Sequence, residues 1–371
     1  MVEFPLTSSS YIYVCTRLRV RKAGLLPAEV YMRLLGMGLP GITRFLGEHG
    51  YGTEIHDFVH RYHGIDLVEI ALSRNLASSF QEVIRITPGH LKTLTTWYLN
   101  RWDIANVMSL LRGLHKGLSQ SWIRSFIVPA GELDRDVLER AIAEKTVGGA
   151  IGQLARWRLY PTLSAECGRE PAKGRFARTE NALYRMYYAD LLADCETGLR
   201  GAPILGDYIR LELDIANFRN LLRLRSVGAR CDCATEIIPG GTVPVAGFRE
   251  LEGIADRESF ESWFRGTRIL PLLVEALGRV RGNPSLGEAE ALAFIWEIWS
   301  QRRRPMHEVE MAVAHLRLGR MGRVSKLEPF SVLAILDYLE RKKYEVFNLR
   351  AISRGISSGI PADEIRHYLV I

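Results

Sequence analysis

Residues 103–117 read DIANVMSLLRGLHKG, and the polar pattern of this stretch returns twice further along the chain. Its four fixed positions are an acidic residue, an Asn three residues later, an Arg and a Gly. The copies are Asp103, Asn106, Arg112 and Gly117, then, 111 residues on, Asp214, Asn217, Arg223 and Gly228, and, a further 131 residues on, Glu345, Asn348, Arg354 and Gly359. Agreement at four positions without slippage indicates one structural unit used several times.

The residues between the fixed positions place each copy on a helix. In the first copy, Ile104, Val107, Met108, Leu110 and Leu111 recur at three- and four-residue spacing, and the second copy follows the same rhythm. This spacing is typical of a core-facing helix. The Arg falls in the last turn, where a cation meets the negative end of the helix dipole, and the Gly can adopt the left-handed conformation that follows a helix. The pattern therefore predicts a helix end.

Further elements repeat around the motif. Upstream lie Glu69-x-Ala71-Leu72-x-Arg74, then Glu180-x-Ala182-Leu183-x-Arg185, and a looser version with Glu310, Ala312, Val313 and His315. Downstream, Ile127-Val-Pro-Ala-Gly131 is echoed by Ile237-Ile-Pro-Gly-Gly241, whereas the third copy shows no such echo before Ile371. Arg19 and Gly24 resemble a further start of the unit. The motif copies and this N-terminal start thus mark four junctions along the chain, which are separated by three long intervals of sequence.

The motif residues are interpreted as architectural. An acidic residue and an Asn on one helix face can hydrogen-bond neighbouring backbone, since polar groups that become buried must find partners. Direct contact with a partner protein is the alternative. Catalysis fits poorly, because an active site needs different residues that converge once, and here one constellation is distributed over three places.

Composition agrees with a large helical protein. The chain has 371 residues, of which 47% are hydrophobic and 25% charged, close to ordinary globular usage. Leu, Ala, Arg and Glu dominate the long segments. We predict an all-α fold of three similar helical units, residues 1–116, 117–227 and 228–371, since domains of roughly 100–200 residues are usual.

The expected compartment is the cytoplasm. The sequence contains no charge-free apolar run of about 20 residues, which a spanning helix needs, and no convincing secretory signal. The cysteines are odd in number and scattered, which indicates reduced thiols; they are Cys15, Cys167, Cys195, Cys231 and Cys233. The pair Cys231-x-Cys233 lacks a second pair or a nearby His, so zinc is not favoured.

The net charge of +7 bears on partners. Arg302, Arg303 and Arg304 form a basic run that is a possible contact with acidic lipid headgroups or an acidic protein, although a solvated face is the simpler interpretation. Nucleic acid is not expected, because the sequence contains no recognition-helix, zinc-finger or RNA-binding signature.

Catalytic and cofactor sites are not indicated. His56, His60 and His63 stand at helical spacing, so three imidazoles could line one helix face. Three consecutive turns of one helix seldom surround one ion, and no H-E-x-x-H accompanies them. The sequence contains neither a P-loop nor a dinucleotide fingerprint nor a nucleophile elbow. We expect no catalytic residues, no metal and no cofactor.

The repeated segments resemble a known family. They are Tyr98-Leu-Asn-Arg-Trp-Asp103-Ile-Ala-Asn106, Leu213-Asp214-Ile-Ala-Asn217, Tyr344-Glu345-Val-Phe-Asn348-Leu-Arg350, Pro129-Ala-Gly131 and Gly359-Ile-Pro361-Ala-Asp-Glu364-Ile365-Arg366. These look like the signatures of the C subunit of the archaeal A-type ATP synthase, which is similar to its bacterial V-type counterpart and to the d subunit of the eukaryotic vacuolar ATPase. The resemblance extends from about Tyr13 to Ile371. Departures concentrate in the third copy, with Glu345 in place of Asp and His315 in place of Arg.

The resemblance implies a non-catalytic part of a rotary motor. Members of the family form a pseudo-threefold funnel of three helical domains on the cytoplasmic face of the cell membrane. The funnel sits on the proteolipid c ring and receives the central shaft, which consists of the D and F subunits, so the implied localisation is peripheral. Two other classes stay open: a cytosolic helical-repeat scaffold that binds peptides, and an enzyme with a metal or thiol centre. The scaffold would use repeats of about 33–47 residues, much shorter than the period here.

Overall fold

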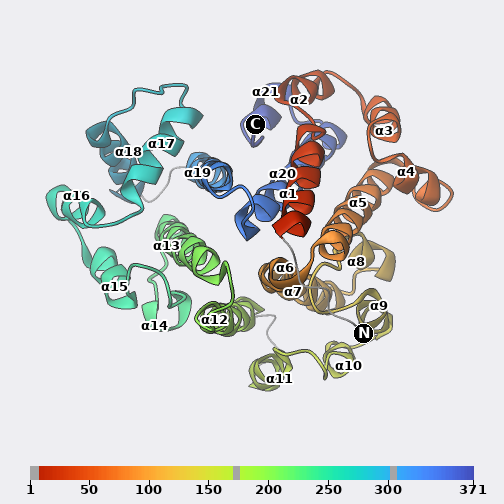
Figure 1. Ribbon diagram of the computed structural model, residues 1–371, viewed down its shortest axis with the longest axis horizontal. Helices are drawn as coiled ribbons and strands as arrows, with labels where there is room; N and C mark the ends of the chain where they lie inside the picture. The colour runs from red at the N-terminus through yellow and green to blue at the C-terminus, as the bar shows by residue number, and fades with distance from the viewer. Residues whose placement is uncertain (1–7, 170–175, 301–306) are drawn as a thin grey trace. The chain divides into compact units, whose positions relative to one another are not determined.

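The computed structural model describes residues 8–169, 176–300 and 307–371, and every regular element in these ranges is a helix (Figure 1). The predicted all-α class is therefore confirmed for the described part of the chain. Contacts divide the chain into two compact units, of which the first comprises residues up to Phe176 together with Glu328–Ile371, and the second comprises Ala177–Leu327. The division into three repeat-based units and their funnel arrangement stay predictions.

The first unit is built around one long helix near the C-terminus. Its helices are α1 (Ser8–Ala23), α2 (Ala28–Leu35), α3 (Leu39–Glu48), α4 (Gly52–Phe58), α5 (Gly64–Ile86), α6 (Gly89–Leu99), α7 (Arg101–His115), α8 (Gln120–Phe126), α9 (Arg135–Ala143), α10 (Val147–Gln153), α11 (Tyr160–Arg169), α20 (Val332–Ser357) and α21 (Ala362–Arg366). Helix α20 packs against α1, α2, α3, α5, α6 and α21. The N-terminal and C-terminal parts of the sequence thus share one core.

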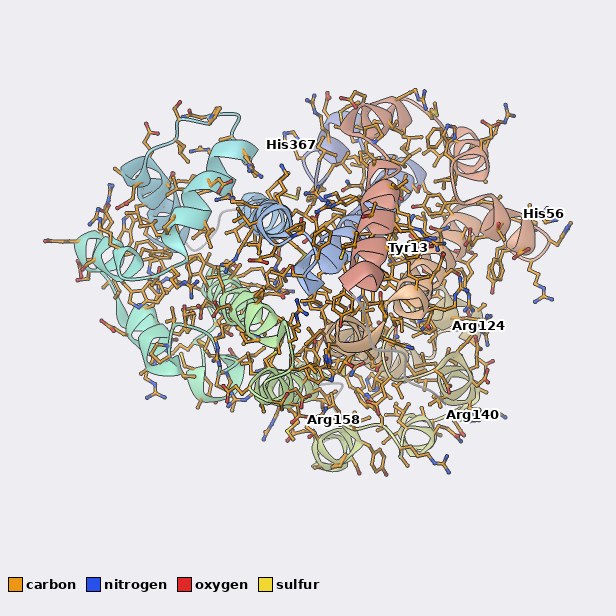
Figure 2. All side chains as sticks on the ribbon, viewed as in Figure 1. Tyr13, His56, Arg124, Arg140, Arg158 and His367 are labelled. Atoms are coloured by element: carbon orange, nitrogen blue, oxygen red, sulfur yellow. The ribbon has the colours of Figure 1, made fainter. Side chains whose placement is uncertain are left out.

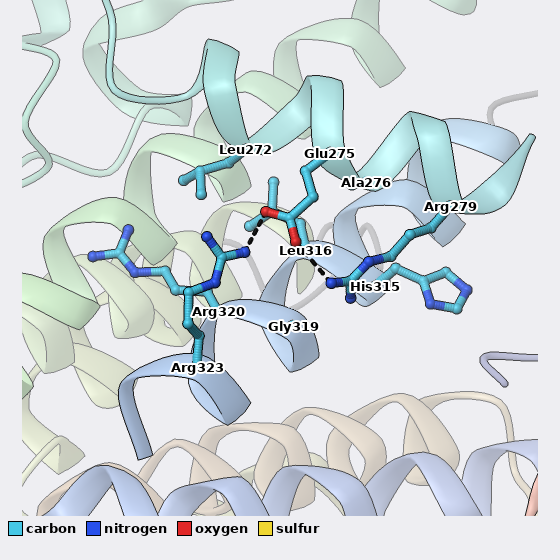
Figure 3. Close-up of a pocket in the computed structure, with 9 residues that line it drawn as sticks. All are labelled: Leu272, Glu275, Ala276, Arg279, His315, Leu316, Gly319, Arg320 and Arg323. Carbon is cyan, nitrogen blue, oxygen red and sulfur yellow. Dashed lines mark hydrogen bonds and ion pairs between the residues drawn. The ribbon is translucent and has the colours of Figure 1, made fainter. Parts of the chain in front are cut away.

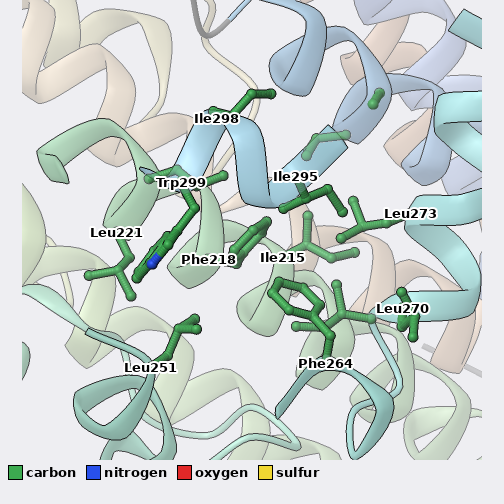
Figure 4. Packing of buried hydrophobic residues seen from close by; sticks show 14 of the residues in the cluster. Ile215, Phe218, Leu221, Leu251, Phe264, Leu270, Leu273, Ile295, Ile298 and Trp299 are labelled. Carbon is green, nitrogen blue, oxygen red and sulfur yellow. The ribbon is translucent and has the colours of Figure 1, made fainter. Parts of the chain in front are cut away.

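The second unit has its own core. Its helices are α12 (Phe176–Cys195), α13 (Ala202–Ser226), α14 (Cys233–Glu236), α15 (Val245–Gly253), α16 (Arg257–Arg265), α17 (Leu270–Val280), α18 (Glu288–Ser300) and α19 (His307–Leu327). Aliphatic and aromatic side chains pack together in this core (Figure 4). Phe218 meets Phe264 edge to face with centroids 5.0 Å apart, and Phe260 lies 5.5 Å from Trp299. Aromatic pairs of this geometry contribute about 1 kcal/mol each beyond the area they bury.

Several short helices begin at side chains that cap them. The capping residues are Ser119 for α8, Asp134 for α9, Thr146 for α10 and Asp256 for α16. Each side-chain oxygen accepts a hydrogen bond from a backbone N–H in the first turn, at 2.8–3.2 Å. A cap of this kind stabilises a helix by about 1 kcal/mol. Local sequence therefore fixes where these helices start.

The histidine hypothesis is wrong in its geometry. Helix α4 ends at Phe58, so only His56 of the three histidines lies on it, and His63 precedes the next helix. The backbone N–H groups of Arg61 and Tyr62 both bond to the carbonyl of Phe58, which closes the turn. Figure 2 shows His56 at the outer edge of the first unit. The three imidazoles do not share a helix face.

No helix in the described ranges combines the length and the apolar character that a membrane crossing requires.

Candidate functional site

The three repeated Asn side chains make the same pair of hydrogen bonds to the backbone. Each holds the backbone of one residue that lies 21 or 22 positions later, and the pairs are Asn106 with Val128, Asn217 with Ile238, and Asn348 with Val370. In every pair the side-chain NH₂ donates to the backbone carbonyl at 2.8 Å, and the side-chain oxygen accepts from the backbone N–H at 2.9 Å. We call this arrangement the asparagine clamp.

The clamps lie in the interior. All three Asn residues are at most 2% exposed. An amide side chain matches the donor and acceptor of a peptide unit, so one residue satisfies two backbone groups, each of which would cost about 1–3 kcal/mol if it were buried without a partner. The third clamp shows that the third copy has a structural counterpart of the segment from Ile127 to Gly131, although its sequence carries no such echo. Val370 takes the structural place of Val128.

The acidic residue of the first two copies binds the same returning segment. The carboxylates accept backbone N–H bonds at 2.7–3.1 Å, from Glu132 and Leu133 to Asp103, and from Thr242 and Val243 to Asp214. The segment passes so close that a Cβ on Gly131 or Gly241 would lie 2.4 Å or 2.0 Å from a carboxylate oxygen. This approach explains the Gly at the end of both downstream echoes.

Burial dominates the acid–base behaviour of these carboxyl groups. It raises the pKa of Asp103 to about 8, against the opposing effect of the backbone N–H donors, and it also raises the pKa of Asp214. Asp103 is fully buried, and its Oδ1 has no hydrogen-bond partner among the described residues. The carboxyl group of Asp103 is therefore mostly protonated at neutral pH.

The third copy uses Glu345 with different partners. Its Oε2 accepts from the backbone N–H of Leu26 at 2.7 Å, while its Oε1 accepts from the Tyr51 hydroxyl at 2.6 Å and from Lys342 Nζ at 2.7 Å. Leu26 stands two residues before α2, as Leu133 stands two residues before α9 and Val243 two before α15. The N-terminal segment thus supplies, for the third copy, the backbone donor that the following chain supplies in the other two.

The glycines end their helices as predicted. Gly117, Gly228 and Gly359 have φ values of +65°, +73° and +70°. After each one, the next N–H bonds to the carbonyl five residues back, at 2.9–3.0 Å, which is the Schellman arrangement. Gly24 is not among the positive-φ glycines, so the N-terminal segment does not reproduce this ending.

The repeated Arg lies in the last helical turn in all three copies, as predicted. In the third copy, Arg354 forms an ion pair with Glu69, the acidic residue of the upstream element, and Arg350 Nε lies 3.2 Å from the other oxygen of Glu69. Glu69 is 5% exposed. Residues repeated in sequence here connect two copies of the unit, α5 and α20.

The other candidate sites have limited chemistry. Across residues 8–169, 176–300 and 307–371, no three His, Cys, Asp or Glu side chains are arranged to hold a metal ion. No disulfide joins any of the five cysteines, which all lie in these ranges, and the Sγ atoms of Cys231 and Cys233 lie 3.6 Å apart beside Glu252. Burial raises the pKa of both thiols, which disfavours the reactive thiolate. Arg302, Arg303 and Arg304 lie outside the described residues.

A pocket in the second unit lies beside Cys231. It has a volume of about 470 Å³ and is lined by residues that include Arg225, Arg249, Cys231 and Trp299. The Arg225 guanidinium lies 4.2 Å from the centroid of the Trp299 ring and donates to the Trp299 carbonyl. One side of the pocket is therefore formed by the Arg225 side chain, which stacks on Trp299 and hydrogen-bonds to it. These contacts stabilise the end of α13.

Sequence reasoning missed the partners of the motif. The motif predicted that the Asp and Asn residues share one helix face and hydrogen-bond neighbouring backbone, but it did not identify the contacted residues. The downstream echo was the available signal, since Val128 and Ile238 occupy the same place within it. For Glu345, the sequence carried no signal that pointed to Leu26.

The comparisons with known proteins cover nearly the whole chain. The family model described as ATP synthase (C/AC39) subunit matches residues 14–368. The A-type ATP synthase C subunit of Methanococcoides burtonii is 31% identical over 98% of this chain and 95% of that protein. The proteins of the same name from Methanosarcina mazei and Haloferax volcanii are 32% and 31% identical, over 98% and 97% of this chain and 94% and 97% of their own lengths.

Proposed function

The chain belongs to the ATP synthase (C/AC39) subunit family, and from this premise we propose that it is a non-catalytic central-stalk subunit of a rotary A-type/V-type ATP synthase. It acts as a socket that couples the shaft, made of the D and F subunits, to the proteolipid c ring. The complex makes ATP from an ion gradient or moves ions at the expense of ATP. The observation that supports this role is the asparagine clamp, which occurs three times and each time holds a returning segment of backbone against a long helix.

A coupling part has to be stiff within each unit. The clamps fix returning segments onto long helices through the hydrogen bonds of buried Asn side chains, and the helices pack with fully buried apolar side chains. Interiors packed at this density transmit displacement with little compression. A torque applied at one surface of such a unit therefore reaches another surface with little loss.

Helix α1 is a candidate for contact with the shaft. Its inner face buries Val14, Cys15 and Leu18, yet Tyr13 and Val20 are 59% and 70% exposed. Tyr13 is labelled in Figure 2. Tyr13 and Val20 are seven positions apart and so share one helix face, and we propose that a partner covers this face. A stable contact would bury roughly 1,600 Å² in total.

The test is co-purification combined with a coupling assay. A tagged copy of the chain, isolated from solubilised membranes, should carry the c ring and both shaft proteins with it. Depletion of the chain should abolish ATP-driven ion transport while ATP hydrolysis by the soluble sector continues. A complex that lacks the chain and still couples hydrolysis to transport would refute the role.

The peripheral placement on the cytoplasmic face of the membrane has a separate test. We propose that Arg302, Arg303 and Arg304 contact the membrane sector. Reversal of their charge to Glu should reduce retention of the chain on washed membranes, whereas Arg257→Glu on α16 should not. Equal retention of both variants would reject the assignment of these three residues.

A further inference from the structure

Helix α1 has an exposed face in addition to its buried one. Four exposed residues lie along it at successive spacings of three, four and three, and they are Tyr13, Thr16, Val20 and Ala23. Alternating steps of three and four residues keep side chains on one face of a helix, and they make up the seven-residue repeat by which two helices pack along each other. We call these four residues the α1 seam.

The side chains of the α1 seam differ in size in the way that such packing needs. The larger Tyr13 and Val20 alternate with the smaller Thr16 and Ala23. In a helix pair, a side chain of one helix fits into the space between four residues of the other, so the small residues leave room for side chains of a partner. Ile12, next to Tyr13, is 44% exposed and widens the apolar area. The α1 seam therefore has the form of one half of a helix pair.

Two arginines flank the α1 seam. Arg17 follows Thr16 and Arg19 precedes Val20, and these are the two positions that border the apolar residues in the seven-residue repeat. Charged residues at these positions select a partner helix by opposite charge. The sequence of α1 contains no Asp or Glu. The seam is therefore bordered by a cation on each side.

Arg19 is exposed, and it forms no ion pair with any residue in the described ranges. Its guanidinium donates to the Pro329 carbonyl at 3.5 Å, which is a long hydrogen bond. Other exposed arginines differ in this respect, since Arg279 and Arg323 in the second unit both pair with Glu275 (Figure 3). A carboxylate of a partner can therefore reach Arg19 without displacing an internal ion pair.

Arg17 shares a single carboxylate with two other arginines. Oε1 of Glu82 lies 3.3 Å from Arg17 Nη2, pairs also with Arg21, and lies 3.8 Å from Arg85 Nη2. One negative charge therefore faces three positive ones, and this border of the seam retains a net positive charge. Arg17 also donates to the Tyr13 hydroxyl at 3.1 Å, which holds its guanidinium beside the seam.

We propose that the α1 seam binds one α-helix of a partner protein, and that Asp or Glu residues border the apolar stripe of that helix. The inference rests on the proposed function, in which the shaft supplies the helix, and it adds the chemistry by which the shaft is recognised. A membrane surface is the less favoured occupant. Helices that lie in a lipid interface bury large apolar side chains, whereas two of the four seam residues are Thr16 and Ala23.

The first experiment measures binding of the purified shaft, D together with F, to the full chain at low and at high salt. Arg19→Glu should weaken binding about tenfold at low salt, because an attractive charge becomes a repulsive one. The difference should narrow at high salt, which screens exposed charges. Arg140→Glu is the matched control, since Arg140 is an exposed arginine of the same unit that lies apart from Tyr13 in Figure 2, and it should bind as the wild type does.

A second pair of variants tests the apolar part of the α1 seam. Val20→Ser should weaken shaft binding about fivefold at both salt concentrations, because it removes apolar surface and no charge. Val227→Ser is the matched control at a valine that is 74% exposed, and it should leave the affinity unchanged. All four side chains are exposed, so each variant should unfold at the temperature of the wild type, which thermal unfolding checks.

Photo-cross-linking identifies the chemistry of the occupant. In the assembled complex, a benzophenone side chain in place of Val20 should cross-link to a helix of the shaft, next to Asp or Glu residues of that helix. Cross-links to lipid, to a second copy of this chain, or to a shaft segment without acidic neighbours would overturn the proposal.

The outcomes separate this inference from the proposed function. Shaft binding that neither Arg19→Glu nor Val20→Ser weakens would overturn the α1 seam and leave the proposed function intact. A wild-type chain that binds no shaft would refute both. Sedimentation with phosphatidylglycerol vesicles tests the alternative occupant: if Arg19→Glu abolishes vesicle binding and leaves shaft binding unchanged, the face contacts a membrane and the proposal is wrong.

Discussion

The asparagine clamp makes a quantitative prediction for Asn217→Ala. The substitution removes two hydrogen bonds of 2.8 Å and 2.9 Å, and it leaves the N–H and the carbonyl of Ile238 without their partner. An unsatisfied buried group costs about 1–3 kcal/mol. Ile238 is half-buried, so water recovers part of this loss, and we expect a local destabilisation of about 2–4 kcal/mol.

Hydrogen exchange measured by mass spectrometry reports this loss where it occurs. Amides of the segment from Ile237 to Val243 should lose protection by about 30- to 700-fold, the equivalent of the predicted free energy. Asn217→Asp should behave similarly at neutral pH, because a carboxylate oxygen would face the Ile238 carbonyl. Its protection should partly return in acid, where the carboxyl group regains a donor.

Asn220→Ala is the matched control, three residues along the same helix. The Asn220 side chain makes one hydrogen bond, 3.3 Å long, to the carbonyl of Glu236. Its removal should cost less than about 1 kcal/mol. If the two variants lower protection equally, or if Asn217→Ala leaves the segment protected, the clamp does not stabilise the returning chain and the reasoning fails.

The remaining predictions concern titration, a buried ion pair and a thiol. The raised pKa of Asp103 means that the folded state binds its proton more tightly than the unfolded chain. The stabilisation is therefore complete below about pH 4 and is lost as the pH rises through about 8, and Asp103→Asn should flatten this part of the stability profile in denaturant titrations. Glu69→Gln leaves the Arg350 cation largely buried without its carboxylate, so it should lower the unfolding free energy by about 3 kcal/mol; a loss below about 1 kcal/mol would contradict the buried pair. Iodoacetamide at pH 8 should label Cys167, which is half-buried, before Cys231, whose thiol pKa is raised by burial, and equal rates by peptide mass spectrometry would contradict this order.

The sequence alone predicts where several helices end and which residues lie at those ends. The positive φ of Gly117 and the position of Arg112 in the last turn follow from residues within one or two turns of the helix end. Bonds at a helix end join groups only a few residues apart, so local sequence decides them. The shared helix face considered for His56, His60 and His63 is absent for a different reason. Spacing alone cannot show that the chain turns after Phe58, and the new helix direction is set by packing of α4 and α5.

The sequence by itself therefore determined an all-α protein with one motif used three times, and it located the helix ends that carry the motif. Only the tertiary structure decided what the motif binds. Glu345 and Leu26 are 319 residues apart, and no local rule connects them. Such a contact exists because the apolar faces of α1, α2 and α20 pack together and bring the two segments of the chain to the same place. Helix ends are fixed by short-range hydrogen bonding, whereas the partners of buried side chains are fixed by the packing of the whole unit.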